Sequence, residues 1–170
     1  MTRPAPLRPT SHARSAVGLV GFVALAFAAG GLGSWLQGPS AEVSARYAAF
    51  ALPTWAPPAA AFGIVWPVLY LLIGLAGWRV WRAAGSVAGA RGALGLWSGQ
   101  LAINALWPGV FFGLGLLGLA AAVIVVLALV VVASVLAAAR HDRLAAWLLV
   151  PYLAWLLYAG ALNIAIWTSA

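Results

Sequence analysis

The sequence contains no cysteine and no lysine, and only two of its residues are acidic, Glu42 and Asp142. The absence of cysteine excludes disulfide bonds and thiol chemistry. Charged residues make up 6% of the chain, whereas an ordinary soluble domain carries about 25%. With 65% hydrophobic residues and a mean hydropathy of +1.05, the chain cannot cover a water-facing surface. We therefore expect an integral membrane protein.

Four long uncharged stretches divide the chain into segments that can cross a bilayer. They cover residues 15–41, 47–78, 92–139 and 144–170. Because a transmembrane helix needs about 20 residues, the third stretch can supply two spans, joined by a turn near 106–118, where glycine is frequent. The predicted fold class is all-α, a bundle of five transmembrane helices over about 16–36, 58–82, 93–112, 116–139 and 145–168.

The segments in front of the first two spans are rich in proline. Residues 1–15 are also basic, and we expect a disordered tail there, followed by a single membrane domain over 16–170. The apolar run after the tail is longer than the roughly 7–15 residues of a cleaved signal peptide, so it is interpreted as a retained first span. Between the first and second spans, we expect a proline-rich loop at about 37–58.

The nine arginines predict an orientation. With five spans, all except Arg46 fall on one side of the membrane, namely Arg3, Arg8, Arg14, Arg79, Arg82, Arg91, Arg140 and Arg143. Since positive charge favours the cytoplasmic side, the N-terminus is expected in the cytoplasm and the C-terminus outside it. We attribute the net charge of +7 to this orientation and expect no nucleic-acid binding.

Few residues are available for catalysis, but aromatic residues are abundant. Neither acids nor histidines fall within the predicted helices, and the chain offers no paired carboxylates, metal-ligand cluster or Ser-His-Asp set. Three predicted helices instead carry stripes at helical spacing: Phe62, Trp66 and Tyr70; Asn104, Trp107 and Phe111; and Trp155, Ala159 and Leu162 with Asn163 beside them. Facing one another, these stripes would line an apolar pocket with a few polar anchors, as small-molecule sites do.

Each of these features also has a purely structural interpretation. Tryptophan is enriched at membrane interfaces, and we expect the tryptophans near helix ends to lie there: Trp35, Trp78, Trp81, Trp97 and Trp147. The tryptophans of the stripes could equally serve helix packing. Asn104 and Asn163 could bridge helices instead of contacting a ligand.

Three stretches of the chain resemble, in order, motifs of the tryptophan-rich sensory protein/translocator protein (TspO/MBR) family. They read PTWAPPAAAFGIVWPVLY, QLAINALWPGVFFG and PYLAWLLYAGALNIAIW. The resemblance runs from about Gly18 to Trp167. It implies a five-helix membrane bundle, commonly dimeric, that binds porphyrins and other flat hydrophobic ligands and holds no covalent cofactor. In mitochondrial members it also implies cholesterol and drug binding.

The resemblance assigns individual site residues. The family's Pro-x-Trp-x-Pro-Pro loop falls on Pro53, Trp55, Pro57 and Pro58 and would form a rigid lid over the pocket tryptophan, Trp66. The remaining family positions fall on Asn104, Trp107, Pro151, Tyr152, Trp155, Ala159, Leu162 and Asn163. Ile164 stands where the family's cholesterol pattern has a tyrosine, and no basic residue follows it, so sterol binding is not implied.

From these features we predict a receptor or sensor in a bacterial inner membrane, surrounded by lipid, that binds a porphyrin or haem-type tetrapyrrole among Trp66, Trp107 and Trp155. One alternative is an enzyme that degrades porphyrin in light through Trp66 and Trp155. Others are a carrier of porphyrin or lipid, and a scaffold. A homodimer is expected, with Gly95 and Gly99 as candidate interface residues, because a GxxxG spacing lets backbones approach closely.

Overall fold

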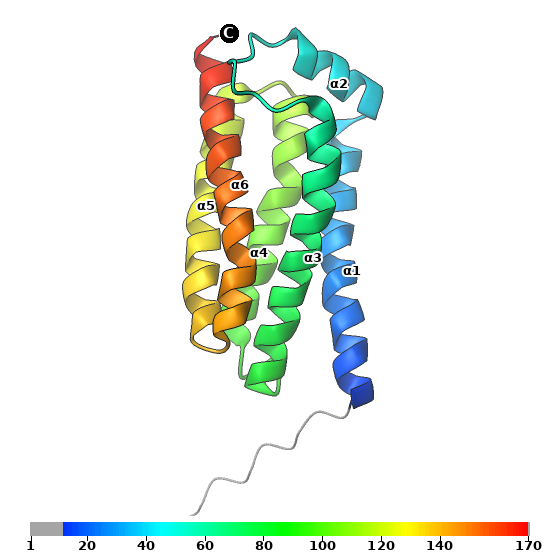
Figure 1. Cartoon of the computed structure of the whole chain (residues 1–170), viewed down its shortest axis with the longest axis vertical. Helices are drawn as coiled ribbons and strands as arrows, with labels where there is room; N and C mark the ends of the chain where they lie inside the picture. The colour runs from blue at the N-terminus through cyan, green and yellow to red at the C-terminus, as the bar shows by residue number, and fades with distance from the viewer. Residues whose placement is uncertain (1–11, 170) are drawn as a thin grey trace, which may run out of the picture.

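The structure, a computed structural model, describes residues 12–169, which form helices joined by short connections without any strand. The predicted tail over 1–15 lies mainly outside the described residues, and residues 12–15 already belong to the first helix. The long helices run lengthwise through one bundle, and a short helix lies across one end, near the C-terminus (Figure 1). In chain order the elements are α1 (His12–Gln37), α2 (Ser40–Ala49), α3 (Ala59–Ala84), α4 (Arg91–Pro108), the π-helix η1 (Gly109–Gly113), α5 (Leu117–Ala139) and α6 (Arg143–Thr168).

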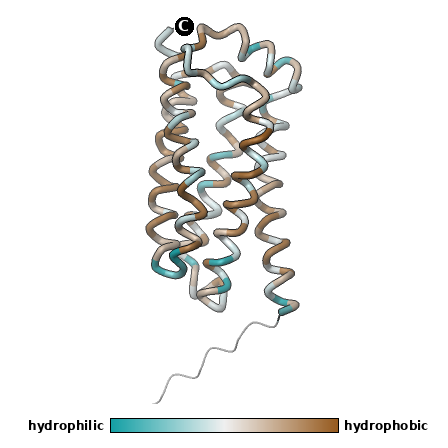
Figure 2. Tube along the Cα trace, viewed as in Figure 1, coloured by the Kyte–Doolittle hydropathy of each residue, from teal (hydrophilic) through white to brown (hydrophobic). Residues whose placement is uncertain are grey.

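Four of these helices, α1, α3, α5 and α6, are long and apolar enough to cross a membrane. The helix α4 lies beside them in the bundle, but its 18 residues include Arg91, Gln100 and Asn104, which lower its hydropathy. Figure 2 shows hydrophobic positions along the helices and hydrophilic positions concentrated toward the two ends. The structure thus supports an all-helical, multi-pass membrane protein, with four of the five predicted spans meeting the criterion of length and composition.

The described arginines separate between the two ends of the bundle. The beginnings of α1, α4 and α6 and the ends of α3 and α5 lie together at one end, whereas α2 lies at the other (Figure 1). The first end holds Arg14, Arg79, Arg82, Arg91, Arg140 and Arg143, and Arg46 lies on α2. Arg3 and Arg8 fall outside the described residues.

Asp142 ties the connection between α5 and α6 to α3 at the basic end. Its carboxylate accepts a hydrogen bond from the Ala145 N–H at 3.0 Å and so caps α6. It also accepts one from Arg79 Nη2 at 2.7 Å. Partial burial alone raises the pKa of the Asp142 carboxyl, but the hydrogen bonds from Arg79 and Ala145 and the Arg79 charge outweigh it and hold the pKa below its ordinary value.

The first helix packs on α3 through glycine. The buried residues of α1 are Ala26, Gly30 and Gly33, and its half-buried Phe22 packs against Trp97 of α4 with 5.1 Å between ring centroids. A Cβ atom added to Gly30 would lie 2.3 Å from Cε2 of Tyr70. This close approach is the kind of helix contact that membrane bundles use, because van der Waals packing drives their association.

Two of the tryptophans predicted at the membrane interface are buried instead. Trp97 is 6% exposed, and its Nε1 donates a hydrogen bond to the Ile73 carbonyl at 2.8 Å. Trp81 is 8% exposed. The short connection over residues 85–90 holds the beginning of α4 against α3, so a ring near a helix end still points into the bundle. The prediction is wrong for these two residues, whereas Trp35 and Trp147 are exposed.

The structure also differs from the expected loop and from the expected third helix. Residues 37–58 are not loop throughout, because ten of them form α2, whose Val43 and Tyr47 face inward at an i, i+4 spacing. The predicted third helix is α4 continued by η1, in which the Leu114 N–H donates to the Gly109 carbonyl at 2.8 Å.

Candidate functional site: a cavity beneath α2

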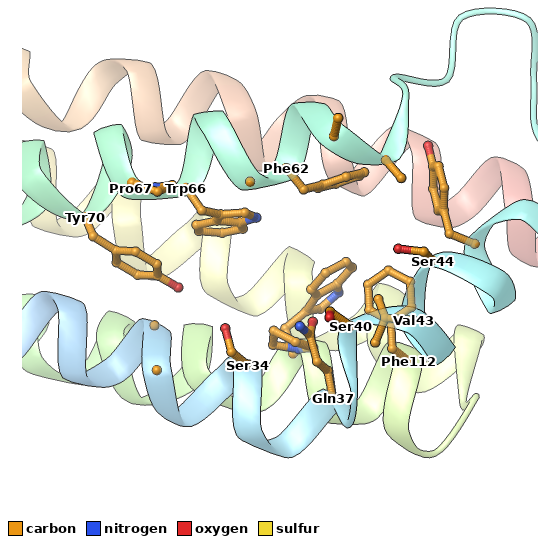
Figure 3. A pocket seen from close by; sticks show the side chains of 18 of the residues that line it. Ser34, Gln37, Ser40, Val43, Ser44, Phe62, Trp66, Pro67, Tyr70 and Phe112 are labelled. Atoms are coloured by element: carbon orange, nitrogen blue, oxygen red, sulfur yellow. The ribbon is translucent and has the colours of Figure 1, made fainter.

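A cavity of about 550 Å³ lies at the α2 end of the bundle, enclosed by α1, α2, α3 and the junction of α4 with η1. Figure 3 shows its two sides, with Phe62 and Trp66 of α3 on one and Ser34 and Gln37 of α1 on the other. The side formed by α3 is aromatic, and the side formed by α1 and α2 carries both polar and apolar side chains.

The helix α3 supplies most of the aromatic wall. Phe62, Trp66 and Tyr70 recur every four residues, so they share one helix face, and all three line the cavity. Trp66 stacks on Tyr70 with 5.4 Å between ring centroids and 26° between planes. Pro67 lacks an N–H group, so the carbonyl of Gly63, four residues earlier, does not receive the usual helical hydrogen bond. Gly63 also lines the cavity.

The opposite side is uncharged and of mixed polarity. Ser34 and Gln37 from α1 and Ser40 and Ser44 from α2 line the cavity there, together with apolar and aromatic residues of the same helices, Phe27, Val43 and Tyr47. None of the serine and glutamine side chains makes a hydrogen bond to another described residue. Ser34, Ser40 and Ser44 are exposed, and Gln37 is half-buried.

The helix α2 closes the end of the cavity and is held there by Arg46. The Arg46 guanidinium donates hydrogen bonds to the carbonyl of Phe112 and, at 3.3 Å, to that of Gly113. Both carbonyls belong to the end of η1, where the chain leaves the helix. Arg46 also forms an exposed ion pair with Glu42 at 3.7 Å. A single side chain thus joins the cover of the cavity to the far end of α4.

The connection from α2 to α3 contains Trp55 and Pro57, and both act through their backbone carbonyls. The Tyr47 hydroxyl donates to the Pro57 carbonyl at 2.8 Å, and the Tyr158 hydroxyl donates to the Trp55 carbonyl at 2.9 Å. Burial, and then the neighbouring Tyr158, raises the pKa of the Tyr47 hydroxyl above its ordinary value. Neither Trp55 nor Pro57 lines the cavity, and the carbonyls of both residues help to fasten the cover.

The predicted residues of α6 lie behind the aromatic wall. A second, much smaller cavity of about 10 Å³ is lined by six predicted residues, Phe62, Trp107, Phe111, Ala159, Leu162 and Asn163. Phe62 and Trp107, with Tyr47 and Phe112, also line the main cavity. Trp155 lines neither cavity; its ring lies 5.7 Å from that of Phe62, and its indole Nε1 is buried without a hydrogen-bond partner among the described residues.

The two predicted asparagines bridge helices. The Tyr70 hydroxyl donates to Asn104 Oδ1 at 2.8 Å, and Asn104 Nδ2 donates to the Tyr152 hydroxyl at 3.0 Å, which joins α3, α4 and α6. Trp107 Nε1 donates to Asn163 Oδ1 at 3.3 Å, and Asn163 Nδ2 donates at 3.0 Å to the first carbonyl of α5. The interpretation of these amides as helix bridges is confirmed.

Members of all three predicted stripes line the smaller cavity, namely Phe62, Trp107, Phe111, Ala159, Leu162 and Asn163. The main cavity is bordered by the whole α3 stripe and by Trp107. The walls that α1 and α2 supply were not predicted. The sequence does contain a signal for them, because the end of an otherwise apolar run carries polar residues at spacings of three or four, Ser34, Gln37, Ser40 and Ser44.

The cavity offers binding contacts and no charged groups. No charged side chain lines it, and the described residues contain no group of three or more His, Asp or Glu side chains that could hold a metal ion. Mostly apolar and aromatic walls with a few neutral hydrogen-bonding groups are the usual composition of a small-molecule site.

The fold defines a multi-pass helical membrane protein with a cavity at one end of its bundle. The TspO/MBR family model matches residues 22–168, and the chain belongs to that family. It is 38% identical to the translocator protein of Homo sapiens over 122 residues, which is 71% of this chain and 72% of the relative. It is 41% identical to the tryptophan-rich sensory protein of Cereibacter sphaeroides over 111 residues, 65% and 68% of the two chains. It is 36% identical to the tryptophan-rich protein TspO of Archaeoglobus fulgidus over 160 residues, 88% and 94% of the two chains.

Proposed function

We propose that this protein is a membrane receptor or sensor that binds a porphyrin, or a similarly flat hydrophobic molecule, in the cavity beneath α2. The observation that supports this most directly is the wall formed by Phe62, Trp66 and Tyr70, whose rings border a cavity of about 550 Å³. Flat aromatic ligands gain both buried apolar area and ring contacts from such a wall. The names of the relatives, sensory protein and translocator protein, agree with a receptor role.

The experiment that tests this proposal is a porphyrin titration of the purified protein in lipid nanodiscs, followed by tryptophan fluorescence and porphyrin absorbance. A lost aromatic contact removes about 0.5–1.5 kcal/mol beyond its buried area, so we expect Trp66→Ala to weaken binding by about tenfold or more. Trp147→Ala is the matched control, because Trp147 is 69% exposed and lies at the opposite end of the bundle. Equal losses in the two variants would place the ligand elsewhere.

A second candidate function is light-dependent degradation of the bound porphyrin. It is favoured by the position of Trp66, an oxidisable ring in the cavity lining. Trp155, the other predicted reacting residue, is separated from the cavity by Phe62. Loss of porphyrin absorbance on illumination that requires Trp66 would support this function, and equal loss with Trp66→Phe would exclude it.

We further propose that α4 is a fifth span, in a bacterial inner membrane with the N-terminus in the cytoplasm and the C-terminus in the periplasm. The support is the separation of the described arginines, six at one end of the bundle and Arg46 at the other. Positive charge favours the cytoplasmic end, and an odd number of spans puts the termini on opposite sides. Terminal reporter fusions test this, and activity of both fusions on the same side would contradict it.

We also propose a homodimer in which α4 contributes Gly95 and Gly99. A Cβ atom added to either glycine would meet nothing within 4 Å, so neither packs against another described helix. This leaves their face of α4 open to a second copy. The double variant Gly95→Leu, Gly99→Leu is expected to halve the mass of the particle in nanodiscs or detergent, and an unchanged mass would show that these residues are not the interface.

A further inference from the structure

One polar side chain in the core of the bundle has no hydrogen-bond partner in the described part of the chain. Four polar side chains are buried there, those of Gln100, Asn104, Ser134 and Asn163. Ser134 donates to the Val130 carbonyl, and both asparagines bridge helices. Gln100 is 0% exposed, yet neither its Oε1 nor its Nε2 bonds to a described residue. Because a buried amide without partners costs free energy, we expect Gln100 to bind a group that the chain does not supply.

The hydroxyl of Tyr152 is a second group with unused hydrogen-bonding capacity. Tyr152 is also 0% exposed, and its oxygen accepts a hydrogen bond from Asn104 Nδ2 at 3.0 Å. The same hydroxyl donates to no other described residue. Since Tyr70 donates to Asn104 Oδ1 at 2.8 Å, the bonds run in one direction from α3 through α4 to α6. The proton at the end of this chain, on Tyr152, still needs an acceptor.

The two groups share one region of the core. Gln100 lies one turn before Asn104 on the buried face of α4, and residues four apart on a helix have Cβ atoms about 5–6 Å apart. Asn104 contacts Tyr152 directly, so the Gln100 amide lies on the same side of α4 as the Tyr152 hydroxyl. The helix α4 packs closely on α1 and α5 but much less closely on α3 and α6. Side chains, and not close backbone contact, therefore fill the space between α4 and α6.

The unused groups fit a small neutral ligand that both donates and accepts. The Gln100 carbonyl needs a donor, whereas its N–H groups and the Tyr152 hydroxyl need acceptors. Water does both, and a buried water typically makes about three hydrogen bonds to polar groups that are otherwise unsatisfied. An ion would lose its hydration in a core where no charged side chain of the described residues is buried to pair with it. Gln100 lines neither of the two cavities described above, which argues against a large ligand.

We propose that a water molecule is bound in the bundle core between Gln100 and Tyr152. It accepts a hydrogen bond from the Tyr152 hydroxyl and donates one to Gln100 Oε1. The water thus joins α4 to α6 and extends the chain of bonds that starts at Tyr70, in the lining of the main cavity. This site explains how α4 accommodates a glutamine inside an apolar bundle. It is independent of the proposed function, because it requires nothing bound in the main cavity.

The test observes the Gln100 amide by nuclear magnetic resonance on the full-length protein in nanodiscs. The chain has two glutamines, Gln37 and Gln100, so isotope labelling of glutamine side chains in the variant Gln37→Met leaves a single amide signal. We expect a cross-peak between this amide and water. Tyr152→Phe removes the hydroxyl that holds the water and should abolish most of the cross-peak. Tyr158→Phe is the matched control on the same helix, because its hydroxyl bonds to the Trp55 carbonyl, and should leave the cross-peak unchanged.

A second measurement uses the sign of a stability change. Gln100→Met keeps the length of the side chain and removes both of its polar atoms. If water satisfies the amide, the variant leaves the water and the Tyr152 hydroxyl with fewer partners, and the thermal unfolding midpoint should fall by about 2–4 °C. If the amide is unsatisfied, its removal relieves a cost of burial, and the midpoint should rise.

Each outcome decides for or against the water site. A cross-peak that depends on Tyr152, with a lower midpoint for Gln100→Met, is the expected result. Absence of the cross-peak would overturn the inference, and so would an unchanged or higher midpoint. A cross-peak that survives Tyr152→Phe would overturn the bridge between α4 and α6. None of these results depends on porphyrin binding, so the proposed function can fail without affecting this inference.

Discussion

Removal of the Arg46 side chain should free α2 without unfolding the bundle. Arg46 donates to the carbonyls of Phe112 and Gly113, which are 66 and 67 residues away in sequence. These bonds join the cover of the cavity to the end of η1. Without the Arg46 bonds, α2 keeps one side-chain hydrogen bond to a described residue outside the helix, which the Tyr47 hydroxyl donates to the Pro57 carbonyl. The packing of α3, α5 and α6 is untouched.

The magnitude follows from the charge and exposure of the side chain. Hydrogen bonds to a charged group contribute about 1.5–3 kcal/mol, but the Arg46 side chain is 48% exposed. Water therefore replaces part of what is lost, and we expect Arg46→Ala to cost about 1–1.5 kcal/mol. This corresponds to a roughly tenfold larger population of detached α2. The ion pair with Glu42, at 3.7 Å and similarly exposed, should contribute no more than about 0.5 kcal/mol.

Hydrogen–deuterium exchange in nanodiscs measures this population directly. Amides of α2 should exchange about tenfold faster in Arg46→Ala than in the wild type, while amides of α5 stay unchanged. Glu42→Gln is the control, because it removes the ion pair and keeps the bonds to the carbonyls. The reasoning is refuted if Arg46→Ala leaves α2 exchange within twofold of the wild type, or if Glu42→Gln accelerates it equally.

Two further predictions concern packing and charge. Gly30→Ala should destabilise the fold by about 1–3 kcal/mol, because its Cβ would lie 2.3 Å from a Tyr70 ring atom. Gly21→Ala is the control and should not destabilise the fold, because nothing lies within 4 Å of a Cβ at that position. Equal thermal unfolding midpoints for the two variants would contradict the prediction. The pKa of Asp142 is lowered in the folded state. The stabilisation from its contact with Arg79 should therefore be fully present above the ordinary carboxyl pKa of about 3.9. It should be lost as pH falls through the lower pKa that Asp142 has in the folded protein. The difference in unfolding midpoint between wild type and Asp142→Asn should therefore narrow as pH drops below about 4, and a constant difference would show that the carboxylate charge is not responsible.

The parts of the fold that hydropathy controls could be predicted from the sequence. The long helices begin and end near charged or glycine-rich positions, because lipid demands uninterrupted apolar helices. The stripe of Phe62, Trp66 and Tyr70 could also be predicted, since a spacing of four places residues on one face whatever the neighbouring helix is. That stripe does line a cavity.

The features that tertiary packing decides could not be predicted in this way. Trp97 lies near a helix end, which favours an interfacial position, but the neighbouring helix supplies a buried acceptor, the Ile73 carbonyl. The ten residues of α2 lie between prolines and carry only a short amphipathic pattern, which the loop signal of the flanking residues obscured. Helical spacing also places Trp155 on an inward face, but it cannot show that Phe62 lies in front of it.

The packing of α1 has a practical consequence for experiments in detergent. Its buried residues are small, its inward ring, Phe22, is half-buried, and bulky side chains such as Val17, Leu25 and Trp35 are exposed at 59–76%. The helices α5 and α6 have the most extensive contact in the bundle, so in detergent α1 should separate before they do. Because α1 forms one wall of the cavity, such a sample would keep its helical circular dichroism and lose its ligand. Retained helicity is therefore no measure of a binding-competent preparation.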